Sequence, residues 1–337
     1  MPDILLIDPT LRDGNHAVRH QINAEQISAY CQAADAAGIP IVEVGHGNGV
    51  GASSLQVGLA KLSQEEMFRA ARDHLTTTRL GTLIMPGFGT IKAHLQPAID
   101  QGVEVMRVIA HCTAVDTSLR AIRYASQRVE TYCCFGNSHL GSPEVLISEG
   151  RKIQEAGAQG LTLMDSAGAM LPSQVTLLIS ALVDALDIPI GFHAHNNLGM
   201  AIANTLAAAQ AGATMVDACA RGFGAGAGNA QLELVVGVLA REGFNTGVDL
   251  YKALDLGDLA DTLLLTQARP TTDTVAIVAG LSGIFGGFTK HVLRISAQFG
   301  VDPRDVFFEL GRRQVLGGQE DLILDVAADL ARQRQSA

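Results

Sequence analysis

The stretch ILLIDPT, residues 4–10, is a short apolar run that ends in polar residues, and seven similar runs follow it along the chain. They are IPIVEVGHG (39–47), GTLIMPG (81–87), VEVMRVIAH (103–111), VETYCCFGNS (129–138), GLTLMDSAG (160–168), IPIGFHAHN (188–196) and TMVDACARGFG (214–224). Their spacing mostly leaves room for a helix between neighbours, which predicts alternating strands and helices. Several runs are apolar almost throughout, as is typical of parallel strands that helices cover.

Eight strand and helix repeats are the number that closes a (β/α)8 TIM barrel, which is an α/β fold. An open, doubly wound parallel sheet is the main alternative. Polar residues gather at the carboxyl ends of nearly all the runs, which is where the active sites of barrels lie. We therefore expect the closed barrel.

Beyond about residue 245 the strand pattern stops and amphipathic helical segments take over. These segments are LYKALDLGDLADTLLL (250–265), DTVAIVAGLSGIFGGFTKHVLRISAQFG (273–300), PRDVFFELGRRQ (303–314) and EDLILDVAADLARQ (320–333). Asp302 before Pro303 predicts a capped helix start, and Gly300 predicts the end of the preceding helix. The sequence therefore predicts a barrel domain over residues 1–245 and an α-helical C-terminal domain over residues 246–337.

Composition indicates a globular protein with a large core. Of the 337 residues 47% are hydrophobic and 17% charged, and the formal net charge of −10 disfavours nucleic acid as a partner. The N-terminal run has no basic region before it, and the uncharged stretch 275–289 is too short and too rich in glycine to span a membrane. The five cysteines are scattered without C-x-x-C spacing, as expected where thiols stay reduced. We expect a cytoplasmic protein that binds no membrane.

The strongest local signal for chemistry is HAHN at residues 193–196, inside the seventh run. Residues two apart on a strand point to the same face, so His193 and His195 can bind one metal ion. Two histidines with ordinary hydrogen-bonding partners are the alternative. A third ligand would decide between them.

Asp13 is the candidate third ligand, because it follows the first strand and the ends of barrel strands converge. One carboxylate and two imidazoles leave open coordination positions and suit Mn²⁺, Mg²⁺, Co²⁺ or Zn²⁺ in a catalytic site. The alternative for Asp13 is a helix cap. The segment GFGAGAGNA, residues 222–230, lacks the spacing of a nucleotide-binding loop, and we expect it to turn tightly and bring Asn229 toward the metal.

Two further residues lie close to Asp13 in the sequence. The guanidinium of Arg12 is suited to stabilise a carboxylate or a developing enolate oxygen, because it stays charged and offers several donors. The imidazole of His16, with a pKa near neutrality, is suited to move a proton to or from a substrate hydroxyl. The alternatives are a surface ion pair for Arg12 and an ordinary loop position for His16.

The chain resembles the metal-dependent barrel lyases and synthases that share an Asp-x-Thr-Leu-Arg-Asp-Gly opening, the DRE-type TIM-barrel metallolyases. The motifs that carry the resemblance are DPTLRDGNHA (8–17), EVGHG (43–47), FHAHNNLG (192–199) and GAGAGNAQLE (224–233). Within that superfamily it is most similar to the 4-hydroxy-2-oxovalerate aldolase family. This likeness continues through MPGFGT (85–90), AHCTAVD (110–116), MDSAGAM (164–170) and the tail at 309–330, and so covers almost the whole chain.

The resemblance implies a reversible cleavage of a 4-hydroxy-2-oxo acid into an aldehyde and pyruvate. A divalent metal, Mn²⁺ first, would chelate the 2-oxo acid. Arg12 would stabilise the enolate, His16 would take the proton of the 4-hydroxyl, and Ser166 would orient the substrate carboxylate. Leu83 and Met85 match positions that bound the aldehyde pocket. The resemblance also implies a partner, an acylating aldehyde dehydrogenase that docks on the helical C-terminal domain and receives the aldehyde through a tunnel.

One departure from the family lies in GIFGGFTKH, residues 283–291. Phe285 stands where the family has a tyrosine, and Gly286 and Gly287 stand near family serines. The missing hydroxyl and the glycines lead us to expect an enlarged aldehyde pocket, with an aromatic aldehyde or a 2-oxobutyrate donor in a biosynthetic reaction as candidates.

Two other functions stay open at this stage. One is a Claisen-type synthase of the isopropylmalate synthase kind, which condenses an acyl-CoA with a 2-oxo acid on the same metal site. The other is a non-catalytic scaffold for the dehydrogenase.

Overall fold

The computed structural model describes residues 3–264, 271–315 and 319–336. In these residues eight parallel strands pair with their neighbours in chain order, and β1 pairs with β8 to close a barrel. The strands are β1 (Leu5–Leu11), β2 (Ile41–Val44), β3 (Arg79–Ile84), β4 (Val105–His111), β5 (Glu130–Gly136), β6 (Leu161–Asp165), β7 (Ile190–Ala194) and β8 (Met215–Asp217). The predicted closed barrel is confirmed, and the open sheet is excluded.

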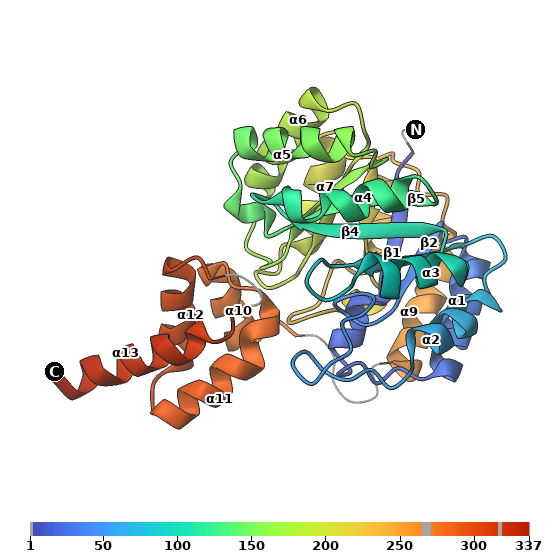
Figure 1. Ribbon diagram of the computed structural model, residues 1–337. Helices are drawn as coiled ribbons and strands as arrows, with labels where there is room; N and C mark the ends of the chain where they lie inside the picture. Colours follow the sequence, from blue (N-terminus) through green and yellow to red (C-terminus); the bar gives the residue numbers. More distant parts are fainter. Residues whose placement is uncertain (1–2, 265–270, 316–318, 337) are drawn as a thin grey trace.

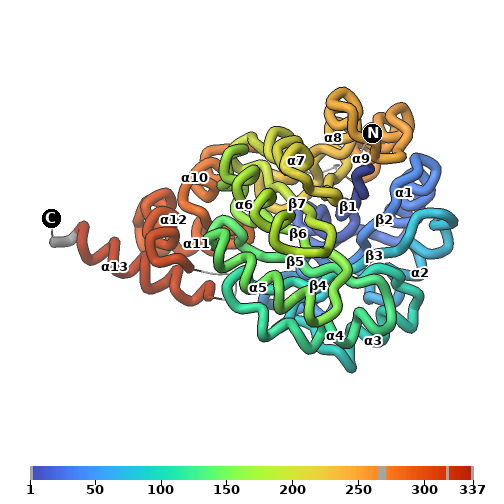
Figure 2. Tube along the Cα trace, turned by 90° about the horizontal axis from the view of Figure 1, so that it is seen from above, coloured from blue at the N-terminus to red at the C-terminus, as the bar shows by residue number. Residues whose placement is uncertain are grey.

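Helices surround the strands, as the view from above shows (Figure 2). They are α1 (Ala24–Ala37), α2 (Gln64–Arg72), α3 (Gln96–Asp100), α4 (Leu119–Ser126), α5 (Pro143–Glu155), α6 (Pro172–Ala185), α7 (Ala201–Gln210), α8 (Leu232–Arg241) and α9 (Leu250–Leu263). Local sequence explains where they begin. Asn23 and Gln26 form a capping box at α1, and Ser142 caps α5 ahead of Pro143.

Side chains fill the inside of the barrel in layers. Near the amino ends of the strands a small cluster contains Ile7, Ile41, Val105, Tyr132 and Met215. Nearer the carboxyl ends a second cluster contains Leu83, Cys134 and Met164. The interior is therefore packed, which leaves the carboxyl-end mouth as the place for chemistry. All five cysteines are free thiols, as their scattered spacing predicted, and all are buried.

The eighth strand is shorter than predicted. Residues 214–224 were expected to form it, but β8 covers only Met215–Asp217. The chain then turns through a 3₁₀ turn, η5 (Ala220–Gly222), in which Arg221 has a φ of 52°. The side chain of Arg221 forms ion pairs with Glu233 and with Asp261 on α9. These ion pairs join η5 to α8 and α9, and hydropathy alone does not reveal them.

The described residues beyond the barrel form the helices α10 (Thr274–Ser282), α11 (Thr289–Phe299), α12 (Pro303–Arg312) and α13 (Leu322–Ser336). They lie at one side of the barrel, coloured orange to red in Figure 1. They have a core of their own, built from residues between Val278 and Ala327. The predicted cap at Asp302 and the helix end at Gly300, with a φ of 66°, are both present. The helical C-terminal region is therefore confirmed.

The division after residue 245 stays a prediction. Helix α9 follows that point, yet Ala253, Leu256 and Ala260 belong to the core of the barrel. A barrel unit that folds alone would therefore have to include α9. Part of the helical segment 250–265 and of the tail 309–330 lies outside the described residues, namely residue 265 and residues 316–318.

Candidate active site

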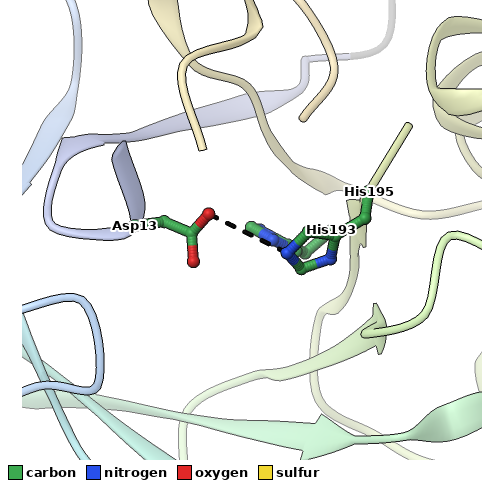
Figure 3. Close-up of side chains that lie close together, drawn as sticks. All are labelled: Asp13, His193 and His195. Carbon is green, nitrogen blue, oxygen red and sulfur yellow. Dashed lines mark ion pairs between the residues drawn. The ribbon is translucent and has the colours of Figure 1, made fainter. Parts of the chain in front are cut away.

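The structure brings Asp13, His193 and His195 together at the carboxyl-end mouth of the barrel (Figure 3). Asp13 begins the short 3₁₀ turn η1 (Asp13–His16) directly after β1, His193 lies in β7, and His195 follows the end of that strand. One potential ligand atom from each residue lies within 4.8 Å of the other two. All three side chains are buried. The convergence expected from strand order is therefore observed.

Hydrogen bonds orient both imidazoles. The Nδ1 of His195 donates to the carbonyl oxygen of Asp165 at 3.0 Å, and the Nδ1 of His193 donates to Oδ2 of Asp217 at 2.8 Å. Each ring therefore keeps the lone pair of Nε2 for another partner. The Nε2 of His195 is buried without a hydrogen-bond partner and lies 3.8 Å from Oδ2 of Asp13. An orphaned buried nitrogen facing a carboxylate fits a bound cation.

The carboxylate of Asp13 is held from both sides. Its Oδ1 accepts from Nη1 of Arg12 at 2.8 Å, and its Oδ2 accepts from Nδ2 of Asn229 at 2.8 Å and from the backbone N–H of Ala225 at 3.2 Å. Burial opposes ionisation, but Arg12 and the nearby histidines hold the pKa of Asp13 well below its usual range. The tight turn expected after β8 does bring Asn229 to this site, where it contacts Asp13.

Arg12 is buried, and most of its donors are used. Its Nε donates to Oε2 of Glu43 at 2.8 Å, and its Nη1 also reaches the carbonyl oxygen of Gly47 at 3.2 Å. Its Nη2 has no partner although it is buried. The alternative of a surface ion pair is therefore excluded. A rigidly held guanidinium with one unpartnered nitrogen is arranged to receive an anionic oxygen.

His16 lies beside two other histidines at the same mouth. Its ring centroid is 5.0 Å from that of His20 and 6.4 Å from that of His46. His20 and His46 stack on each other at 3.6 Å and hold the adjacent loop through its carbonyl groups at Val57 and Gly58. Burial lowers the pKa of His16, so the ring is neutral at neutral pH and able to accept a proton.

Phe285 reaches this mouth from the C-terminal helices. Its ring lies edge-on at 6.2 Å from His195 and 6.5 Å from His16, measured between centroids. A Cβ added at Gly287 would lie 2.5 Å from Cε1 of Phe285, so the Phe285 ring occupies the space beside that glycine. The segment is held in place by hydrogen bonds from Asn197 to the Ala276 carbonyl oxygen and between His139 and the Gly283 carbonyl oxygen.

The remaining candidate residues lie toward the carboxyl ends of β6 and β3. Ser166 follows β6, and its Oγ accepts from the backbone N–H of Asn137 at 2.9 Å. Leu83 is fully buried in β3, whereas Met85, just beyond that strand, is partly exposed. The structure therefore places Ser166 and Met85 at the barrel rim and Leu83 one layer below.

Comparison with known proteins gives consistent matches over nearly the whole chain. Residues 3–260 match the HMGL-like family, and residues 270–332 match the DmpG-like communication domain. A 4-hydroxy-2-oxovalerate aldolase of Spirochaeta aurantia is 54% identical over 332 residues, which cover 98% of this chain and 96% of that protein. The protein of the same name from Streptomyces tendae is also 54% identical, covering 98% of this chain and 92% of its own. The chain belongs to the 4-hydroxy-2-oxovalerate aldolase family.

Membership of this aldolase family confirms the resemblance seen in the motifs, and with it a carbon-carbon lyase. The relatives carry the aldolase name, so the Claisen-type synthase is not favoured. Among solved structures, the carboxyl transferase domain of Rhizobium etli pyruvate carboxylase superposes with a TM-score of 0.80 at 20% identity. The match covers 97% of this chain and 61% of that one, and at this identity it shows the fold alone.

Sequence reasoning missed two buried charges that this family member places beneath the site. Arg107 on β4 and Asp217 on β8 form an ion pair, and Asp217 also accepts the hydrogen bond from His193. Burial opposes ionisation of Asp217, but its contacts with Arg107 and His193 outweigh burial and lower its pKa. An arginine inside the apolar run 103–111 was the available signal, because a charge is rarely buried without a partner.

None of the helices in the described part of the chain combines the length and hydrophobicity that crossing a bilayer requires. The cytoplasmic location expected from the sequence stays a prediction.

Proposed function

We propose that this chain is a divalent-metal-dependent aldolase that reversibly cleaves a 4-hydroxy-2-oxo acid into an aldehyde and pyruvate or 2-oxobutyrate. The observation that carries the proposal is the meeting of Asp13, His193 and His195 within 4.8 Å beside the free donor of Arg12. Relatives 54% identical over nearly the whole chain are named for this reaction.

Asp13, His193 and His195 would hold the metal, with Mn²⁺ the first candidate and Mg²⁺, Co²⁺ or Zn²⁺ as alternatives. One oxygen and two nitrogen donors suit these ions and leave positions open for substrate. When bound, the ion supplies Lewis acidity to the 2-oxo group of the substrate. Asn229 supports this set by its hydrogen bond to Asp13, which holds the carboxylate toward His195.

Arg12 and His16 are proposed as the catalytic residues. The Nη2 of Arg12 donates to the oxygen that gains negative charge when the bond between C3 and C4 breaks, since its other contacts fix it in place. His16 takes the proton of the 4-hydroxyl, and its lowered pKa keeps it in the accepting form at neutral pH. In the reverse reaction the same ring returns the proton to the new alkoxide.

Ser166 is proposed to bind the substrate carboxylate. Because its Oγ accepts the N–H of Asn137, its own hydroxyl proton is left to donate outward. Leu83, Met85 and Phe285 are proposed to bound the aldehyde. The Phe285 ring fills the space beside Gly287, so the expected enlargement of the pocket would come from the missing phenolic hydroxyl and not from that glycine.

An acylating aldehyde dehydrogenase is the proposed partner, docked on α10 to α13. Support comes from the match of residues 270–332 to a communication domain. Exposed apolar side chains on these helices also favour a docking surface. They are Ile277, Leu281, Leu293, Phe308 and Leu324.

A purified-enzyme screen tests reaction and pocket together. Aldehydes from acetaldehyde to benzaldehyde are mixed with pyruvate or 2-oxobutyrate and Mn²⁺, and products are identified by mass. We expect 4-hydroxy-2-oxo acids, with propanal or larger aldehydes accepted. Turnover confined to acetaldehyde and pyruvate would contradict the enlarged pocket but keep the aldolase. Release of free CoA from acyl-CoA with a 2-oxo acid, without aldol product, would contradict the aldolase itself.

A further inference from the structure

Arg107 is a fully buried arginine on β4, and the chemistry proposed above does not use it. Its Nη1 alone donates to two carboxylates, Oε1 of Glu43 at 2.9 Å and Oδ2 of Asp217 at 2.6 Å. Its Nε and Nη2 have no hydrogen-bond partner. Burying an ion pair inside a barrel is weak support for stability, because desolvation offsets the attraction. The position of Arg107 therefore calls for another reason.

The two carboxylates each have a second partner at the active site. Glu43 accepts from Nε of Arg12 through its other oxygen, at 2.8 Å. Oδ2 of Asp217, which binds Arg107, also accepts from Nδ1 of His193 at 2.8 Å. Arg12 in turn donates to Asp13 at 2.8 Å.

These contacts form one continuous path from one candidate metal ligand to another. It runs from Asp13 through Arg12, Glu43, Arg107 and Asp217 to His193. All six side chains are buried, so water does not screen the interactions between them. The path uses neither Nη2 of Arg12 nor Nε2 of His193, the atoms proposed to meet the substrate and the cation.

We propose that Arg107 is a positioning residue that couples the two sides of the metal site. It holds Asp217 so that His193 presents Nε2 to the cation, and it holds Glu43 so that Arg12 keeps Nη2 turned to the substrate. This inference rests on the proposed metal-dependent function. Without Arg107, Glu43 and Asp217 would be like charges buried without a common partner, and their contacts with Arg12 and His193 would shift.

The change in Mn²⁺ affinity caused by Arg107→Gln distinguishes a positioning role of Arg107 from a purely electrostatic one. Arg107→Gln removes a positive charge near the cation, so electrostatics alone predicts tighter Mn²⁺ binding. Positioning predicts weaker binding, by about 10-fold or more, the usual effect of losing a residue that orients a metal ligand. The dissociation constant of Mn²⁺ is measured on the full-length chain from the electron paramagnetic resonance signal of the free ion. Tighter or unchanged binding would overturn the proposal.

Two variants complete the design. Arg79→Gln is the matched control, because Arg79 pairs with Glu130 at the opposite end of the barrel and should leave Mn²⁺ binding unchanged. Arg107→Lys keeps the charge and should recover part of the affinity. At saturating Mn²⁺, Arg107→Gln should also lower kcat more than it raises KM, because Arg12 acts as the bond breaks.

If Arg107→Gln does not fold, a second measurement tests the same coupling. Glu43→Gln and Asp217→Asn each leave Arg107 with one carboxylate, and their effects on the Mn²⁺ dissociation constant are compared singly and together. Coupling through Arg107 predicts that the double variant departs at least about threefold from the product of the single effects. A simple product would overturn the proposal. Wild-type protein that binds no Mn²⁺ would instead overturn the metal-dependent function, and this inference with it.

Discussion

Phe285 is the residue that most distinguishes this site at the level of single side chains. Its ring lies 6.2 Å from His195, a proposed metal ligand, and 6.5 Å from His16, the proposed base for the 4-hydroxyl, so we expect a hydroxyl added to it to contact the aldehyde. Phe285→Tyr should raise the preference for acetaldehyde over larger aldehydes about fivefold in kcat/KM, the value of one hydrogen bond of about 1 kcal/mol.

Competition between paired aldehydes measures this preference. Phe308→Tyr is the control, because Phe308 is 48% exposed on α12 and should change nothing in the isolated enzyme. An unchanged preference in Phe285→Tyr would mean that the ring does not contact the aldehyde.

Asp8 is expected to make the stability of the folded protein depend on pH. It is buried in β1, where it accepts hydrogen bonds from Tyr30 and Thr10. Burial raises its pKa from 3.8 to about 6, which outweighs those hydrogen bonds. The folded state therefore binds the proton more tightly than the unfolded state, so this residue's contribution to stability falls as pH rises from about 4 to 6 and is constant above that range.

Asp8→Asn removes this dependence. When the pH rises from 5 to 7.5, wild type loses this contribution and the variant does not. The free energy of unfolding of Asp8→Asn minus that of wild type should therefore increase by about 1 kcal/mol. Urea unfolding of chelator-treated protein measures both free energies at each pH. The hydrogen bonds that the variant loses weaken it at both pH values, so they cancel when the two differences are compared. A difference that is the same at the two pH values would show that Asp8 titrates normally.

The sequence predicted the residues of the metal site better than the buried residues that hold them in place. Asp13, His193 and His195 could be brought together in advance because strand order in a barrel is known once the eight runs are counted. Arg107 and Asp217 could not be paired, since their contact depends on which side chains of β4 and β8 point into the same layer of the barrel. Phe285 could be singled out by its family position, but not its contact with both histidines.

At the level of elements, α12 packs unusually closely against the end of α10. A Cβ added at Gly311 would lie 2.1 Å from the backbone carbonyl oxygen of Ser282, which cannot move without moving α10. Gly311→Ala should therefore destabilise the C-terminal helices by roughly 2 kcal/mol. Because Phe285 follows α10, the same change should alter aldehyde preference while Mn²⁺ affinity stays the same.

Gly237→Ala on α8 is the matched control for this prediction. Its added Cβ would meet only Leu250, at 3.8 Å, so the helix should gain up to about 1 kcal/mol from the better helix former. Urea unfolding compares the two variants. Equal effects would show that α12 does not depend on close contact at Gly311.

The ends of the strands are not predicted by hydropathy alone. All eight strands lie within the predicted apolar runs or overlap them, but most end earlier, because each run continues into the polar rim. β8 is the extreme case, at three residues. The turn that follows it carries Arg221, whose ion pairs reach Glu233 and Asp261, and no pattern within the run predicts them.

At the scale of the whole molecule, a barrel with its own core carries a helical region with a second core, and the two meet at the site. Leu281 on α10 is 61% exposed and belongs to the proposed docking surface. Leu281→Asp should weaken binding of the proposed acylating aldehyde dehydrogenase at least about 10-fold, because a charge would be buried in an apolar contact. Aldol cleavage by the isolated chain should be unchanged.

Biolayer interferometry with the purified dehydrogenase measures this affinity. Leu177→Asp is the control, because Leu177 is 59% exposed on α6 of the barrel and is not part of the proposed docking surface. If both variants bind like wild type, the partner does not dock through α10.

The most direct test of the account is the recovery of aldol cleavage when Mn²⁺ is added back to chelator-treated protein. Pyruvate release from a 4-hydroxy-2-oxo acid should be lost on chelation and restored by Mn²⁺ in wild type. It should also be restored in Asp184→Asn, which changes an exposed aspartate on α6. Asp13→Asn should need at least about 100-fold more Mn²⁺ or stay inactive, since it loses a charged ligand. Cleavage that survives chelation, or an Asp13→Asn variant restored at the wild-type Mn²⁺ concentration, would contradict the proposed metal site.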